Sequence, residues 1–320
     1  MGGFTIIKSM IFKSSFQSMT LQSIPLLFRI TMSLTSHLKP GQPLHSWFEK
    51  NSNHALLDQL CYEHNSLLSR WKVDYPGEVN FPLVGMAMTY AVRDMIKPLK
   101  ESIEGTVAWH GIQFLGLQSE ARCFLEHPEK AILYVLLGLF DSVGRGRLDK
   151  FETLFGTPPK GNLLPVVKTE SLFTLDTYSR LMQRTIQDVH TNLAKVKTLI
   201  RLHPEVFSNP SNYYVNPTFE NSFLVGGADA QMIVNQTLID IRTTCKRRPF
   251  TKENFYQQIA YVLLGHQSKI THLTWMYTRQ QCLFSYEVEN LFDVFRKQKS
   301  FQDLAESLYF DEADEDEYYG

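Results

Sequence analysis

Hydrophobic residues recur at three- and four-residue spacing through most of the first 205 residues, which predicts amphipathic helices. One pattern begins after Asn53, a good N-terminal cap, and predicts a helix from about His54 to Trp71 with His64 on its apolar stripe. Further helices are expected near Pro82 through Met95, over Ala131–Val143, and after Asp176 as a long helix that ends before Pro204. The Ala131–Val143 segment is apolar on almost all sides, so we expect it to be buried.

The pattern changes after Pro204, where short β-type runs replace helical periodicity. The expected strands are Phe223–Val234, Thr237–Thr244, Ile270–Tyr277 and Gln281–Val288, with one helix near Lys252–Leu264 between the second and the third. A helical half followed by this strand-rich segment predicts an α+β protein, in which a mainly helical N-terminal half packs beside, or inserts into, a small sheet.

Length and composition fit an ordinary globular chain: 320 residues, 43% hydrophobic and 20% charged. We divide it into a mainly helical region at 32–205, a strand-rich core at 206–300 and an acidic tail at 301–320. Residues 1–31 contain no acidic residue, which is typical of a leader segment, although Met32 also reads as a natural start. The tail is expected to be solvated.

Charge and cysteine content exclude several classes of protein. The net charge of −1 leaves no whole-protein basic field, so contact with nucleic acid must come from a local patch. The four cysteines form no CxxC pair, which argues against a zinc ribbon and favours reduced thiols in a cytoplasmic protein. We expect no membrane partner, because no segment is long and apolar enough to span a bilayer.

Neither a Walker motif nor a GxGxxG fingerprint is present, and the Gly144–Arg147 loop does not substitute for one. His110 is interpreted as a loop histidine.

The segment 226–244, GGADAQMIVNQTLIDIRTT, carries the most informative polar pattern. A two-residue turn at Asn235-Gln236 would pair Val234 with Thr237. This register places Asp229 opposite Arg242 and Gln231 opposite Asp240, so these four side chains would share one face of the hairpin; Ala230, Met232, Ile239 and Ile241 would share the other. A divalent cation between the two carboxylates would explain such a face.

The helix that follows the hairpin has clear limits in the sequence. Thr251 is a good N-cap, Phe250 and Phe255 can form a hydrophobic staple, and Gly265 is a natural C-terminal stop. Gln257 and Tyr261 lie four residues apart and therefore share a face.

An acid, then Asp-x-Lys on the next strand, then a helix with Gln-x-x-x-Tyr is the layout of PD-(D/E)XK nucleases of the RecB type. The present chain resembles that family through Asp229, Asp240-Ile-Arg242 and Gln257-Gln-Ile-Ala-Tyr261, most strongly over about residues 216–288. The resemblance extends more weakly to an upstream helix, where Gly85 and Thr89 stand at the positions of a glycine and a metal ligand.

The resemblance implies a small mixed sheet with flanking helices of the PD-(D/E)XK nuclease type. It also implies a nuclease that hydrolyses phosphodiester bonds, in DNA, with Mg²⁺ (or Mn²⁺) held by Asp229 and Asp240. Arg242 would stand where the family has a lysine that positions the attacking water. Gln257 and Tyr261 would approach the nucleic-acid backbone.

Basic residues outside the motifs are expected to bind phosphate. Lys246, Arg247 and Arg248 follow the second motif strand, and Arg279 follows a later strand. The first three could equally form a solvated basic loop.

Two departures from the family pattern leave alternatives open. Arginine at 242 cannot usefully give up a proton, and a threonine hydroxyl at 89 is a poor metal ligand. A catalytically impaired nuclease fold that binds nucleic acid or protein is therefore the alternative function. The sequence does not identify which proteins would be its partners. The two acids and Arg242 could also form an ion-pair cluster without metal, Tyr261 could be a core residue, and the hairpin could belong to an unrelated helical scaffold.

Overall fold

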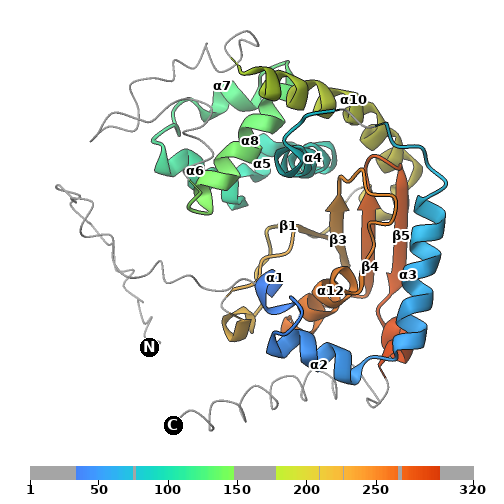
Figure 1. Cartoon of the computed structure of the whole chain (residues 1–320). Coiled ribbons are helices and arrows are strands. Elements are labelled where there is room, and N and C mark those ends of the chain that lie inside the picture. Colours follow the sequence, from blue (N-terminus) through green and yellow to red (C-terminus); the bar gives the residue numbers. More distant parts are fainter. Residues whose placement is uncertain are drawn as a thin grey trace, which may run out of the picture.

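A computed structural model of the chain describes residues 34–74, 77–147, 178–208, 210–225, 227–265 and 269–295. The expected leader, the acidic tail and the expected cap Asp176 lie outside these ranges. Within them the fold is α+β and mainly helical, with a small mixed sheet (Figure 1). No helix in the described ranges combines the length and the apolar character that crossing a membrane requires.

The sheet has five strands in the order β1-β2-β3-β4-β5, which is also their order in the chain. Their bounds are Tyr213–Val215 (β1), Met232–Val234 (β2), Thr237–Arg242 (β3), His272–Tyr277 (β4) and Cys282–Glu287 (β5). Neighbouring strands are antiparallel except β3 and β4, which pair in parallel. Helix α12 (Lys252–Leu264) makes the crossover between these two parallel strands.

The remaining helices are α1 (Leu34–His37), α2 (Pro43–Asn51), α3 (His54–Leu68), α4 (Phe81–Ile96), α5 (Leu99–Ser102), α6 (Val107–Phe114), α7 (Ala121–Leu125), α8 (Lys130–Gly144), α10 (Arg180–Leu202) and α11 (Pro204–Phe207). Most of them form two groups (Figure 1). The first group, α4 to α8, packs together beside the sheet, and α10 packs against α4 and α8. The second group, α1, α2 and α3, lies with α12 on the other side of the strands.

Each face of the sheet belongs to a different hydrophobic core. Met232, Ile239 and Met276 pack with the α4, α8 and α10 group, while Leu238 and Trp275 pack with α12 and the first three helices. The alternation of strand side chains produces this division, since residues two apart share a face. The sheet therefore joins both cores, and the chain does not divide into separate cores at residue 205.

Several predicted elements are confirmed, with small shifts at their ends. Helix α12 has the predicted bounds, and its capping box uses Thr251 and Asn254. The side chain of Asn53 caps α3, although the helix ends at Leu68 rather than Trp71. The strand predicted from Phe223 was too long: a 3₁₀ turn covers Ser222–Val225, and β2 begins only at Met232.

His64 on α3 is fully buried between two aromatic rings. Its ring centroid lies 4.1 Å from those of Phe250 and Phe284, and its Nε2 lies 2.7 Å from the hydroxyl of Tyr286. Burial lowers the pKa of His64 from 6.5 to about 3, because the charged imidazolium would lose its hydration.

This histidine should make the protein less stable in acid. Because its pKa is lower in the folded state, the unfolded chain binds the proton first, and stability falls by about 1.4 kcal/mol per pH unit from pH 6.5 toward pH 3. In urea unfolding at pH 7.5 and pH 5.0, the parent should lose about 2 kcal/mol more than His64→Phe. His110→Gln, which replaces an exposed histidine, should behave like the parent. Equal pH dependence in parent and His64→Phe would contradict the assignment.

Candidate functional site: a basic pocket between the helices and the sheet

The hairpin at the centre of the sheet has the predicted register. Val234 pairs with Thr237 and Met232 with Ile239, and Asn235 takes the positive φ of 54° that the tight turn needs. The pairing stops at Met232, because the Gln231 side chain takes the place of a strand neighbour. Its Oε1 accepts from the Ile241 amide at 2.6 Å, and its Nε2 donates to the Ile241 carbonyl at 3.3 Å.

This interruption changes the predicted faces of the hairpin. Ala230 packs in the core under α12, whereas Met232 packs on the opposite face, so the prediction that they share a face is wrong. Asp229 forms a bridge with Thr218 instead of lying opposite Arg242. The order of polar and apolar residues in the sequence is the same whether Gln231 pairs through its backbone or through its side chain. The sequence therefore could not show this change of face.

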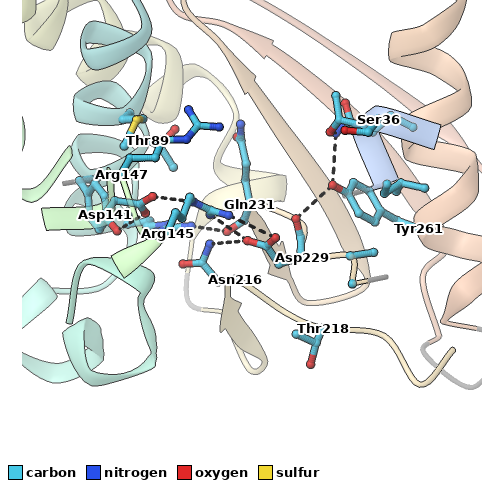
Figure 2. A pocket seen from close by; sticks show the side chains of 18 of the residues that line it. Ser36, Thr89, Asp141, Arg145, Arg147, Asn216, Thr218, Asp229, Gln231 and Tyr261 are labelled. Atoms are coloured by element: carbon cyan, nitrogen blue, oxygen red, sulfur yellow. Dashed lines mark hydrogen bonds and ion pairs between the residues drawn. The ribbon is translucent and has the colours of Figure 1, made fainter. Parts of the chain in front are cut away.

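Asp229 points toward the helical group, where it meets Arg145 at the end of α8 (Figure 2). Arg145 Nη2 donates to Asp229 Oδ2 at 2.8 Å, and Arg145 Nε donates to Asp141 Oδ1 at 2.7 Å. Asp141 also accepts from the Tyr90 hydroxyl at 2.7 Å, and Asn216 lies 3.5 Å from Asp229 Oδ2. Arg145 thus bridges two carboxylates, one from the helical group and one from the approach to β2.

Asp240 lies in a different environment. It is 4% exposed and accepts from Arg242 Nε at 2.6 Å, and Arg242 Nη2 in turn donates to Gln257 Oε1 at 3.2 Å. Burial alone would lower the pKa of Arg242, but the Asp240 carboxylate more than offsets this, so that pKa is raised. Arg242 therefore stays charged. It pairs with Asp240 and Gln257, while Asp229 pairs with Arg145, so Arg242 does not bridge both acids. The metal-free alternative required such a bridge.

The α12 side chains connect the two acids. Gln257 Nε2 donates to the Tyr261 hydroxyl at 3.2 Å, and that hydroxyl donates to the backbone carbonyl of Asp229 at 3.0 Å. Burial raises the pKa of Tyr261, so the phenol remains protonated and acts as a hydrogen-bond donor. Arg242, Gln257 and Tyr261 thus form a continuous chain from Asp240 to Asp229, and the predicted grouping of these residues is present.

A pocket of about 1170 Å³ opens beside Asp229. Its walls come from α1 and the following turn, from α4, from the end of α8, from the approach to β2 and from α12. Its charged lining residues are Lys39, Arg93, Asp141, Arg145, Arg147 and Asp229. Thr89, which the sequence resemblance predicted at a metal-ligand position, also lines it, but its hydroxyl donates to the Gly85 carbonyl at 3.1 Å. Neither Asp240 nor Arg242 is among the lining residues.

The other predicted nucleic-acid contacts do not form one surface with this pocket. Arg279 is 4% exposed and pairs with Asp188 of α10, so the prediction that it faces the site is wrong. Lys246, Arg247 and Arg248 are exposed in the loop after β3 and do not line the pocket. His110 lies on α6, not in a loop.

Sequence reasoning missed Arg93, Asp141 and Arg145. A signal was present, since Arg93 and Asp141 interrupt two strongly apolar helical segments, and charged residues are rarely buried without a specific partner. Arg145 was seen only as part of a loop that fits no nucleotide motif.

The carboxylate oxygens of Asp229 and Asp240 are ligands that a hard cation such as Mg²⁺ prefers. Mg²⁺ commonly binds one or two carboxylates and completes its shell with water and phosphate oxygens, so Asp229 and Asp240 are an adequate donor set. Both carboxylates, however, already accept hydrogen bonds from arginines. Among the residues that the structure describes, no group of three or more His, Cys, Asp or Glu side chains is placed to hold a metal. Binding would therefore require Arg145 and Arg242 to release their carboxylates.

Comparisons with known proteins give no match for this chain, whether with protein-family models, curated proteins or solved structures.

Proposed function

We propose that the chain is a metal-dependent nuclease that hydrolyses phosphodiester bonds, in DNA, at the pocket beside Asp229. The observation that carries the proposal is the chain of contacts Asp240–Arg242–Gln257–Tyr261–Asp229 on β3, α12 and the approach to β2. These are the residues through which the sequence resembles the RecB-type PD-(D/E)XK nucleases. The order of elements, with α12 crossing between parallel strands β3 and β4, is compatible with such a core.

The proposed roles follow from the contacts. Once Arg145 and Arg242 release them, Asp229 and Asp240 would hold Mg²⁺ or Mn²⁺, which would supply a Lewis acid and lower the pKa of a bound water. Arg145 and Arg147 line the pocket and would bind phosphate oxygens. Arg242 cannot act as a proton donor, so its role is to stabilise negative charge. Tyr261 fixes the backbone of Asp229 by its hydrogen bond.

A second candidate is a fold that binds nucleic acid without cleaving it. The specific observation that favours it is the Asp240–Arg242 pair, in which the buried carboxylate already has a guanidinium as its partner. A basic pocket needs no metal to bind phosphate, because arginine forms charge-assisted hydrogen bonds directly.

Calorimetric titration with Mn²⁺ and a cleavage assay on single- and double-stranded DNA distinguish the two candidates. The parent should bind Mn²⁺ and cleave DNA, while Asp229→Asn and Asp240→Asn should lose Mn²⁺ binding and about 10³-fold in cleavage rate, since metal stabilisation contributes several kcal/mol to such reactions. Glu101→Gln, which changes an exposed carboxylate outside the pocket, should retain both properties. A folded parent that binds DNA but neither binds Mn²⁺ nor cleaves would refute the nuclease and support the second candidate.

A further inference from the structure

Arg93 is a buried cation without a carboxylate partner. It lies in the last turn of α4, is 1% exposed, and lines the pocket. Its Nη2 donates to the Gln231 carbonyl at 2.6 Å, and its guanidinium lies 5.0 Å from the centroid of the Tyr90 ring. Among the described residues, its Nε and Nη1 have no hydrogen-bond partner. A buried charge in this condition is costly, so a ligand that supplies the missing acceptors would be bound strongly.

The pocket as a whole carries excess positive charge. Four basic side chains and two carboxylates line it, and Arg145 is matched by both carboxylates. Within the described part of the chain, Lys39, Arg93 and Arg147 form no ion pair. The cations that remain would attract an anion rather than a neutral or basic ligand.

The exposure of the arginines indicates how far an anion must enter. Arg147 is exposed, the Arg145 side chain is 40% exposed, and Arg93 is 1% exposed. An anion that reaches Arg93 must therefore leave the part of the pocket that is open to solvent. A continuous nucleic-acid backbone has to leave as well as enter, whereas a phosphate at the end of a strand can finish there.

We propose that Arg93 and Arg147 form a binding site for a phosphate monoester, with Arg93 as its buried cation and Arg147 as its exposed cation. Such a group carries up to two negative charges and three acceptor oxygens, which suits two guanidinium groups. The phosphorylated end of a nucleic-acid strand supplies this chemistry, and a free nucleotide supplies the same group. Only the choice of a nucleic-acid end rests on the proposed function.

Fluorescence anisotropy in EDTA tests the site without any metal. The probes are labelled twelve-nucleotide DNA strands of one sequence that carry a 5′-phosphate, a 3′-phosphate or hydroxyls at both ends, with adenosine monophosphate as competitor. The parent should bind one phosphorylated strand at least about ten-fold more tightly than the hydroxyl strand. Arg147→Ala should remove most of this preference, and Arg93→Met should remove it entirely. Arg201→Ala, an exposed arginine of α10 outside the pocket, should retain it.

The outcomes separate this site from the nuclease. Competition by adenosine monophosphate in the parent but not in Arg147→Ala would support the site even if no strand is preferred, and would identify a free nucleotide as its ligand. Because Arg147 is exposed, its variant remains informative if Arg93→Met does not fold. Equal binding of all strands together with no competition would overturn the inference, even if the parent cleaves DNA with Mn²⁺. A phosphate preference in a protein that never cleaves would support the site and refute the nuclease.

Discussion

Replacing Asp188 with alanine is expected to lower the free energy of unfolding by about 3–5 kcal/mol, because it leaves the Arg279 charge buried without a partner. Both side chains are almost fully buried, and Arg279 Nη1 donates to Asp188 Oδ1 at 2.8 Å while Nη2 donates to Oδ2. The pair connects the middle of α10 to the second residue beyond β4, so it holds that helix against the sheet. Urea unfolding monitored by circular dichroism measures the change.

Two variants test this explanation of the Asp188 effect. The double variant Asp188→Ala with Arg279→Met removes both charges and should recover most of the lost stability, since an apolar replacement of a buried pair is often well tolerated. Glu78→Ala breaks a surface ion pair of 3.5 Å with Arg184 on the same helix and should cost less than about 1 kcal/mol. A loss in Asp188→Ala as small as that in Glu78→Ala would contradict a buried, uncompensated charge.

The sequence was most informative where local chemistry decides the structure. Thr251 and Gly265 carry the signals that begin and end α12, and Asn235 can adopt the positive φ of a tight turn, so the helix bounds and the hairpin register were predictable. The short edge strand β1 was not predicted, because Tyr213–Val215 offers too few residues for an alternating pattern.

The site was predictable only in part, since its charges are matched by distant residues. The residues Asp240, Arg242, Gln257 and Tyr261 were grouped correctly by motif spacing. The partner of Asp229 is Arg145, which lies 84 positions earlier in the chain, and no local pattern specifies such a contact. Arg279 was misplaced for the same reason, because its partner Asp188 lies 91 positions away.

Directly before Arg145, helices α6 and α8 meet at backbone contact, and a methyl group at this contact should be strongly destabilising. A Cβ on Gly111 would lie 1.9 Å from the Phe140 carbonyl oxygen, and a Cβ on Gly144 would lie 2.2 Å from that of Val107. These are fixed backbone atoms, so the helices must separate.

We expect Gly111→Ala to lower the free energy of unfolding by about 3 kcal/mol or more, at the upper end of the range for overpacked cores. Gly85→Ala on α4 is the matched control, because its Cβ would have no neighbour within 4 Å, and alanine should stabilise that helix by up to about 1 kcal/mol. Urea unfolding of both variants measures the difference. If Gly111→Ala were as stable as Gly85→Ala, helices α6 and α8 would not meet at this point.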